Sequence, residues 1–254
     1  MVDGLRNNMR NVIGLIPSRL GSKRLPGKAL AKIADIPVIV HVAKRAELSK
    51  LLEKVIVCTD SEEIANTCSD YDIEATLTSS NFRNGTERIA SVIENYNYEY
   101  VLDIQGDEPL VNPDHIDIVA EGISKNLKKE DIIIPTLEVP YSVPETIVRV
   151  QTSLSGRIMT LTRASLPHRY SVPIPTVQKH LSVIGFTKKA LIKYSQLEQT
   201  LNEQSEDIEL LRALENDMSL YALPLEGNSF SIDVQDDLIK ARVAMKTDKF
   251  FGKY

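Results

Sequence analysis

The residues VIGLIPSRLGSKRLPGK, at positions 12–28, decide the fold of this chain of 254 amino acids. Positions 12–16 form a continuous apolar run of strand length. The loop that follows, at positions 17–28, contains two glycines, two prolines and four cations. A buried strand that leads into such a loop predicts a ligand site at the carboxyl edge of a parallel sheet.

This loop has the chemistry of an anion site. Gly21 and Gly27 let the backbone bend close to a ligand, and the amide groups of such a bend converge on anionic oxygens. The cations that can neutralise phosphate charges are Arg19, Lys23, Arg24 and Lys28. The loop is neither a Walker A sequence nor a dinucleotide-binding glycine motif. We interpret it as a triphosphate cradle, with a solvated basic turn as the alternative.

Three strand-like segments within the first 80 residues are separated by helical patterns. Strands are predicted at 12–16, 54–59 and 74–78, and helices at 36–48 and from Asp60 to about Cys68. This alternation indicates an α/β fold with a Rossmann-like, doubly wound and mostly parallel sheet.

Polar residues lie at the start of the next predicted helix and at the end of the next predicted strand. Asn84-Gly85-Thr86-Glu87-Arg88 predicts a helix start, whose Arg88 would either reach an anion or pair with a neighbouring glutamate. The strand at 98–104 ends in Gln105-Gly106-Asp107. A carboxylate just beyond a strand end can hold a divalent cation over phosphates, so Asp107 is a candidate Mg²⁺ ligand, with an acidic turn as the alternative.

The second half of the chain predicts a helix at 113–127 and a strand at 132–139, interrupted by Pro135 and hence an edge or bulged strand. The remaining elements are a hairpin around Ser155-Gly156, a proline-rich loop at 167–178, strands at 179–186 and 220–223, and helices at 188–198, 206–216 and 235–246. We expect a single domain at 12–254 with an inserted β-arm at about 147–186. An isolated hairpin is marginal, so we expect the arm to form a C₂ homodimer.

Composition limits the classes of function that this chain can have. The net charge of -5 does not favour nucleic-acid binding, and no apolar run reaches membrane-spanning length. Residues 1–11 are expected to be a disordered leader, with Met1 or Met9 as the start. Two cysteines, Cys58 and Cys68, predict neither a disulfide framework nor a metal site. A cytoplasmic location is expected, because a reducing compartment suits these thiols.

The loop at 17–28 resembles the signature of sugar-acid cytidylyltransferases, and within them the 3-deoxy-manno-octulosonate (Kdo) group. Further landmarks of that family follow in order across roughly residues 12–245. They are Thr59-Asp60, Gly85-Thr86-Glu87-Arg88, Gln105-Gly106-Asp107-Glu108-Pro109, Thr162-Arg163-Ala164, His180-Leu181, Arg212-Ala213-Leu214-Glu215 and Ile232-Asp233.

The resemblance implies activation of a sugar acid with CTP and Mg²⁺ for lipopolysaccharide or another surface glycan. The implied Mg²⁺ ligands are Asp107 and Asp233, and the implied catalytic residues are these two with Lys28 and Arg19. The implied CTP contacts are Pro17, Ser18, Arg19, Ser22, Lys23, Arg24, Lys28, Thr59, Asp60, Gly85 and Gln105. The implied sugar contacts are Arg88, Gln105, Arg163, His180 and Glu209. For His180, the alternative is a strand residue bonded to backbone.

At two positions that would lie in the sugar pocket, this chain departs from the residues that are usual in the Kdo group. The Kdo group usually carries Gln after the glutamate and Tyr four residues after the histidine, where this chain has Leu210 and Ile184. Both changes remove a polar group, which alters how a site treats hydroxyl-bearing substrates. A deoxygenated, aminated or acylated relative of Kdo, or a sialic-acid-like nonulosonate, is therefore an alternative substrate.

Two rival functions also fit a basic glycine-containing first loop. One is a nucleotidyltransferase that acts on a sugar phosphate or polyol phosphate. The other is a nucleotide-binding regulatory module without catalysis. Arg163 and His180 suit a carboxylate acceptor, which disfavours the first, and Asp107 with Asp233 disfavours the second.

Overall fold

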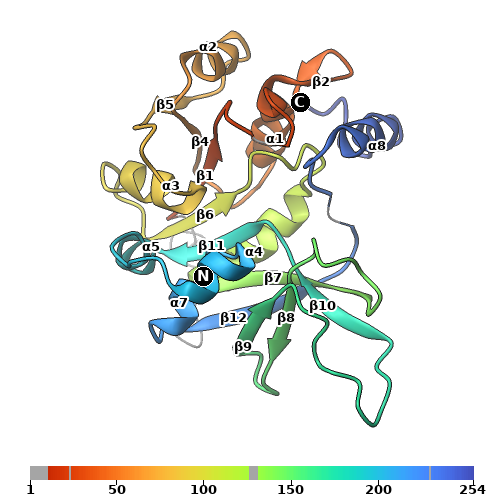
Figure 1. Ribbon diagram of the computed structural model, residues 1–254. Helices are drawn as coiled ribbons and strands as arrows, with labels where there is room; N and C mark the ends of the chain where they lie inside the picture. Colours follow the sequence, from red (N-terminus) through yellow and green to blue (C-terminus); the bar gives the residue numbers. More distant parts are fainter. Residues whose placement is uncertain (1–10, 23, 126–130, 229) are drawn as a thin grey trace, which may run out of the picture.

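The strand β1 (Val12–Ser18) lies inside the parallel part of the sheet (Figure 1). The computed structural model describes residues 11–22, 24–125, 131–228 and 230–254, so the predicted leader lies almost wholly outside the described residues. All of β1 is buried, and it pairs in parallel with β4 (Lys54–Thr59) and β6 (Tyr100–Ile104). Because helices cover both faces, the strand is a continuous apolar run without alternation.

The direction in which successive strands are added to the sheet reverses at β1, which makes this strand a topological switch point. After β1 the chain forms η1 (Lys28–Leu30), β2 (Lys32–Ile33), β3 (Ile36–Pro37) and α1 (Val38–Glu47), and then β4. It continues through α2 (Glu62–Asp70), β5 (Ala75–Leu77) and α3 (Gly85–Ile93) to β6. The sheet order β5-β4-β1-β6 shows that the chain moves outward on one side of β1 and returns on the other. Ligands in such folds bind at the carboxyl ends of the strands beside the reversal, here those of β1 and β6.

The second half of the sheet is mixed. After α4 (Pro113–Lys125) come β7 (Ile132–Pro140), β8 (Arg149–Thr152), β9 (Ile158–Thr162), β10 (Thr176–His180) and β11 (Val183–Thr187). The chain ends with α5 (Lys188–Ser195), α6 (Leu201–Glu206), α7 (Leu211–Glu215), β12 (Leu220–Leu225) and α8 (Gln235–Met245). β10 and β11 both pair antiparallel with β7, while β11 also pairs with β6 and β10 with β8. The predicted α/β class is confirmed. None of the described helices is long and apolar enough to cross a bilayer.

Two predictions about the second half are wrong. The strand containing Pro135 is not at an edge, since β7 pairs with β10, β11 and β12. Pro135 lies opposite the break between β10 and β11, where its carbonyl accepts from the Leu181 N–H at 2.9 Å and its missing N–H costs no ladder bond. The predicted helix at 206–216 begins later, as α7 (Leu211–Glu215), because Asp207 adopts a left-handed conformation (φ 51°) that ends α6 at Glu206.

The predicted arm is part of the main sheet. β8 pairs with β9 and β10, and a bridge between Arg157 and Tyr221 connects the hairpin to β12. The hairpin is therefore stabilised within one chain, and its role in a dimer stays a prediction.

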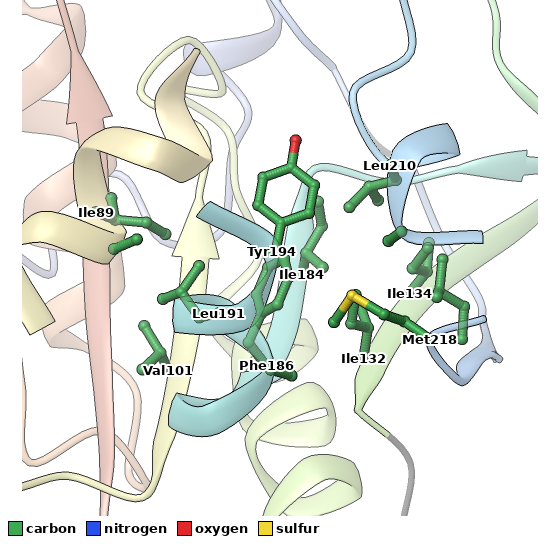
Figure 2. Close-up of a cluster of buried hydrophobic side chains, with 14 of the residues drawn as sticks. Ile89, Val101, Ile132, Ile134, Ile184, Phe186, Leu191, Tyr194, Leu210 and Met218 are labelled. Carbon is green, nitrogen blue, oxygen red and sulfur yellow. The ribbon is translucent and has the colours of Figure 1, made fainter. Parts of the chain in front are cut away.

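The core lies on both faces of the sheet, and β1 contributes to both. Its Ile13 and Leu15 pack in a cluster with side chains of α3, α5 and β11, whereas Val12 and Ile16 pack with α1, α2 and α4. Figure 2 shows the first cluster, in which Tyr194 of α5 lies near Ile184 and Leu210. Because apolar residues at 184 and 210 lie in this cluster, they contribute packing rather than hydrogen bonds.

A buried ion-pair network ties α3, α6 and α7 together. Arg212 is fully buried and donates to Glu203 Oε2 at 2.7 Å and to Glu87 Oε1 at 2.8 Å. Its guanidinium also lies 4.9 Å from the centre of the Tyr194 ring. Removing one member of a buried network leaves its partners desolvated and uncompensated.

We expect Arg212→Ala to lower the free energy of unfolding by about 3–5 kcal/mol, because Glu203 and Glu87 lose the cation that they share. Urea denaturation monitored by circular dichroism measures this change. Arg157→Ala, at an exposed position of the hairpin, is the matched control and should change stability by about 0.5 kcal/mol or less. Equal, small effects of both substitutions would contradict the structural role of Arg212.

Candidate active site at the carboxyl ends of β1 and β6

Three segments meet closely at the switch point. A Cβ atom on Gly106, just after β6, would lie 2.7 Å from the carbonyl oxygen of Pro17 in β1. A Cβ atom on Gly85, the first residue of α3, would lie 2.9 Å from Pro17 Cγ. Only glycine fits at these two positions, so the sequence landmarks at 17, 85 and 106 reflect one packed edge.

Lys28 joins the two predicted metal ligands. Its Nζ donates to Asp107 Oδ2 and to the carbonyl of Ile232, both at 2.7 Å, and lies 3.8 Å from Asp233 Oδ1. Arg24 donates to the same Asp233 oxygen at 2.9 Å. Two aspartates from distant parts of the chain therefore converge on one cationic group beside the basic loop.

The segment at 232–238 is held in place by packing and by hydrogen bonds. Ile232 is fully buried with Ile33, Val38 and Leu238, and its N–H donates to the carbonyl of Asp107 at 2.9 Å. The N–H groups of Asp233 and Val234 both donate to Asp237 Oδ2 in the first turn of α8. These contacts position the Asp233 carboxylate against the end of β6.

The site suits Mg²⁺ chemically. Mg²⁺ commonly uses one or two protein carboxylates and takes its other ligands from substrate phosphates and water. Asp107 and Asp233 supply two oxygen donors that already face one positive group, the Lys28 ammonium. Within the described ranges there is no cluster of three or more His, Cys, Asp or Glu side chains of the kind that could hold a metal. The two carboxylates of Asp107 and Asp233 would therefore hold a metal ion that takes its other ligands from a substrate and water.

Two arginines of the basic loop are exposed, whereas its last lysine, Lys28, turns inward. Ser18 is buried at the end of β1, whereas Arg19 and Arg24 are exposed. The Ser22 hydroxyl accepts from the Leu25 N–H at 3.3 Å, and Gly27 adopts the left-handed conformation (φ 69°) that lets Lys28 turn back toward Asp107. Lys23 lies outside the described residues. The loop therefore combines a fixed Lys28 with exposed arginines.

Arg88 points into the protein. It is buried, donates to Asp60 Oδ2 at 2.8 Å and contacts Thr78 and the carbonyl of Ser79. Thr59 is also buried, and its hydroxyl accepts from the Ser61 N–H at the start of α2. The structure thus pairs a predicted sugar contact, Arg88, with a predicted CTP contact, Asp60, in an ion pair that joins α3 to the end of β4.

Gln105 contacts the first of two neighbouring acidic residues, Asp103 and Glu209. Its Nε2 donates to Asp103 Oδ1, and the Thr86 hydroxyl donates to Asp103 Oδ2, each at 3.0 Å. Asp103 is fully buried, and burial together with the charge of Glu209 raises the pKa of its carboxyl well above the ordinary value. Sequence reasoning missed Asp103, and it named Thr86 only as part of a helix start and a family landmark. The available signal was a charged residue inside the apolar strand at 100–104, since a buried charge needs a specific role.

Glu209 faces the same cluster. Burial raises the pKa of its carboxyl to about 7, whereas the Thr86 hydroxyl and the Arg212 charge act to lower it and the charges of Glu203 and Glu87 act to raise it. Its Oε2 is enclosed and has no hydrogen-bond partner in the described part of the chain. The loop between α6 and α7 thus brings a predicted sugar contact close to Asp103.

Arg163, the residue after β9, lies near His180, the last residue of β10. Arg163 donates to the carbonyls of Glu206, Thr146 and Asp207, which fixes it to the end of α6. Burial lowers the pKa of His180 to about 4, and the charges of Lys179 and Arg163 act in the same direction. The imidazole is neutral at pH 7 and can serve as a hydrogen-bond donor or acceptor without charge.

We expect Glu209→Gln to change how stability depends on pH. Between about pH 5 and pH 7 the folded chain keeps a proton on Glu209 that the unfolded chain has released, so wild-type stability falls as pH rises through this window. The variant lacks this loss, and its Tm relative to wild type should be higher at pH 8 than at pH 5. Glu198→Gln, at an exposed position, is the control. A Tm difference independent of pH would contradict the raised pKa.

Comparison with known proteins identifies the family of this chain. The sequence model of the cytidylyltransferase family matches residues 13–220. The chain is similar to a 3-deoxy-manno-octulosonate cytidylyltransferase of Acidobacterium capsulatum, at 31% identity over 90% of this chain and 94% of that protein. It is similar to one of Anaeromyxobacter sp. (strain K), at 34% identity over 93% and 98%.

Solved structures show the same fold. A CMP:2-keto-3-deoxy-manno-octonic acid synthetase complexed with CTP superposes with a TM-score of 0.88, at 24% identity, over 93% of this chain and 98% of that chain. A 4-diphosphocytidyl-2C-methyl-D-erythritol synthase from Anaerococcus prevotii superposes with a TM-score of 0.60, at 14% identity, over 94% and 97%. The fold, the packed loop and the extent of the sequence match agree, and the chain belongs to the cytidylyltransferase family.

Proposed function

We propose that this enzyme transfers a cytidylyl group from CTP to a sugar acid, 3-deoxy-manno-octulosonate or a close relative, and releases pyrophosphate. The observation that carries the proposal is the convergence of Asp107 and Asp233 on Lys28 beside the basic loop. The names of the similar proteins support the same reaction. The product would serve lipopolysaccharide or another surface glycan.

The loop residues hold the nucleotide in this proposal. The anomeric hydroxyl of the sugar attacks the α-phosphorus of CTP, and pyrophosphate leaves on the opposite side. Such transfers depend on positioning and on neutralisation of charge rather than on a covalent enzyme intermediate. Arg19, Lys23 and Arg24 offset the charge of the phosphates, with Ser18, Ser22 and the amides of the loop as hydrogen-bond donors.

Asp107 and Asp233 would hold Mg²⁺, which supplies neutralisation of phosphate charge and acidifies a bound hydroxyl. Lys28 lies between the two carboxylates, and its positive charge offsets their mutual repulsion. Gln105, Arg163, His180 and Glu209 would form the sugar side, and Thr59, Asp60 and Gly85 the nucleotide side. Arg88, which the resemblance assigns to the sugar, is engaged by Asp60.

We expect Asp107→Asn to reduce Mg²⁺-dependent pyrophosphate release from CTP by about 100-fold or more, because a neutral amide holds a hard cation poorly. Asp233→Asn should act in the same direction. Asp236→Asn, three residues along and exposed, is the matched control. Normal turnover of the Asp107 variant at saturating sugar acid, with an unchanged circular dichroism spectrum, would overturn the metal assignment.

We also propose that the chain forms a homodimer through the segment at 147–186. Support comes from four exposed apolar side chains in this segment: Leu154, Met159, Tyr170 and Val172. A cytoplasmic location is part of the same proposal, since Cys58 and Cys68 are both free and buried.

Light scattering at micromolar concentration should give the mass of two chains for wild type. The double variant Met159→Lys, Val172→Lys should give the mass of one, because it places charges in an apolar interface. Val243→Lys, at an exposed apolar position of α8, is the control and should stay dimeric. A wild-type monomer would refute this part of the proposal.

A further inference from the structure

Arg45, near the end of α1, is a fully buried cation that the proposed reaction does not use. Its Nη1 donates to the carbonyl of Val111 at 3.0 Å, and its Nη2 donates to the carboxylate of Asp248. Val111 lies in the turn that follows β6, and Asp248 lies just after α8. Because a buried charge is costly unless it is paired and hydrogen-bonded, these contacts tie both segments to α1.

Each of these two segments also carries one of the proposed metal ligands. The turn after β6 contains Asp107 and is closed by a bond from the Val111 N–H to the carbonyl of Glu108 at 2.9 Å. The segment before α8 contains Asp233, and α8 connects it to Asp248. A single guanidinium therefore links the segments of both carboxylates at points away from the carboxylates themselves.

The residues after α8 pack over α1 beside Arg45, so that the end of the chain lies next to both helices (Figure 1). The hydroxyl of Tyr254 lies 2.8 Å from His41 Nδ1, and His41 Nε2 lies 2.8 Å from the carbonyl of Ile33. Since a carbonyl only accepts, Nε2 donates and Nδ1 accepts from the tyrosine. The rings of Phe250 and Tyr254 lie 5.5 and 5.9 Å from the guanidinium carbon of Arg45. These contacts hold the far end of α8 against α1.

The far end of α8 affects the placement of Asp233 because a helix moves as a rigid body. A helix of 11 residues spans about 16 Å, so a small rotation about one end displaces the other. Leu238, Ala241 and Met245 of α8 are buried in an apolar cluster, but packed helices can still slide by small amounts. Mg²⁺ demands near-ideal octahedral geometry, so its ligands need a more exact placement than apolar packing provides.

We propose that Arg45 is a positioning residue for the metal pair, which holds the turn after β6 and α8 in the relative placement that lets Asp107 and Asp233 share one cation. This inference rests on the proposed function, because it takes these two aspartates as the Mg²⁺ ligands. Arg45 acts through the shape of its guanidinium, whose two nitrogens reach two segments. A lysine ammonium at this position is a single point of charge and cannot span both.

The first test measures hydrogen exchange by mass spectrometry without CTP or metal, in Arg45→Lys and Asp248→Asn. The lysine variant keeps a positive charge beside Asp248, so the chain should still fold. Peptides covering 105–112 and 230–238 should exchange at least about tenfold faster than in wild type, because their tie to α1 is lost. The amide of Ile232, which bonds to the Asp107 carbonyl, lies in the second peptide. Peptides covering 54–59 should keep the wild-type rate.

The second test measures the Mg²⁺ concentration that gives half-maximal pyrophosphate release with CTP and 3-deoxy-manno-octulosonate. Both variants should need at least about fivefold more Mg²⁺, with KM for the sugar acid unchanged, because small misplacements of ligands cost binding. A purely structural role would lower kcat and leave the Mg²⁺ requirement unchanged. Asp131→Asn is the matched control, because its carboxylate accepts from Ser219 before β7, away from this edge, and it should keep the wild-type Mg²⁺ requirement.

Unchanged exchange of both peptides in both variants would overturn the inference, and so would faster exchange with a wild-type Mg²⁺ requirement. Either result leaves the cytidylyltransferase reaction standing. Absence of pyrophosphate release by wild type with every sugar acid would instead contradict the proposed function. Calorimetric titration of CTP at several Mg²⁺ concentrations then replaces turnover, and an unchanged Mg²⁺ dependence of CTP binding in both variants would overturn the inference as well.

Discussion

The ammonium of Lys28 between Asp107 and Asp233 is the contact on which the site depends. It joins residues separated by 79 and 205 positions in the sequence, namely the end of the basic loop, the turn after β6 and the segment before α8. Two carboxylates close together repel each other unless a positive charge lies between them. The side chain of Lys28 supplies that charge, and the bond from Ile232 N–H to the Asp107 carbonyl holds the last segment against the sheet.

A second electrostatic feature distinguishes the proposed sugar side of the site. The basic loop at 17–28 places positive charge at an exposed position, whereas Asp103 and Glu209 are two acidic groups in a more enclosed region. Thr86 contacts this pair from the first turn of α3, and Gly85 beside it contacts Pro17. The two sides of the site are therefore adjacent through the start of one helix, and a change in α3 would affect both.

Particular elements show how far the sequence could be interpreted. The strands at 54–59 and 98–104 and the helix starts at Ser61 and Asn84 were predictable, because continuous apolar runs and capping side chains are local signals. Pro135 and the helix at 206–216 were not, because their outcome depends on neighbours. Pro135 is tolerated in a central strand only because β10 and β11 break opposite it. The left-handed conformation of Asp207 separates α6 from α7, where the periodicity alone predicts a helix from 206 onward.

The sequence by itself determined the α/β class, the basic loop after the first strand and the family to which the chain belongs, since these depend on residue type and local spacing. Tertiary structure alone decided that Asp107 and Asp233 meet on Lys28, that Arg88 is engaged by Asp60, and that Asp103 joins Glu209. Each of these contacts brings together residues from separate elements. Charge–charge energies depend on distance and burial, which the order of residues along a chain does not specify.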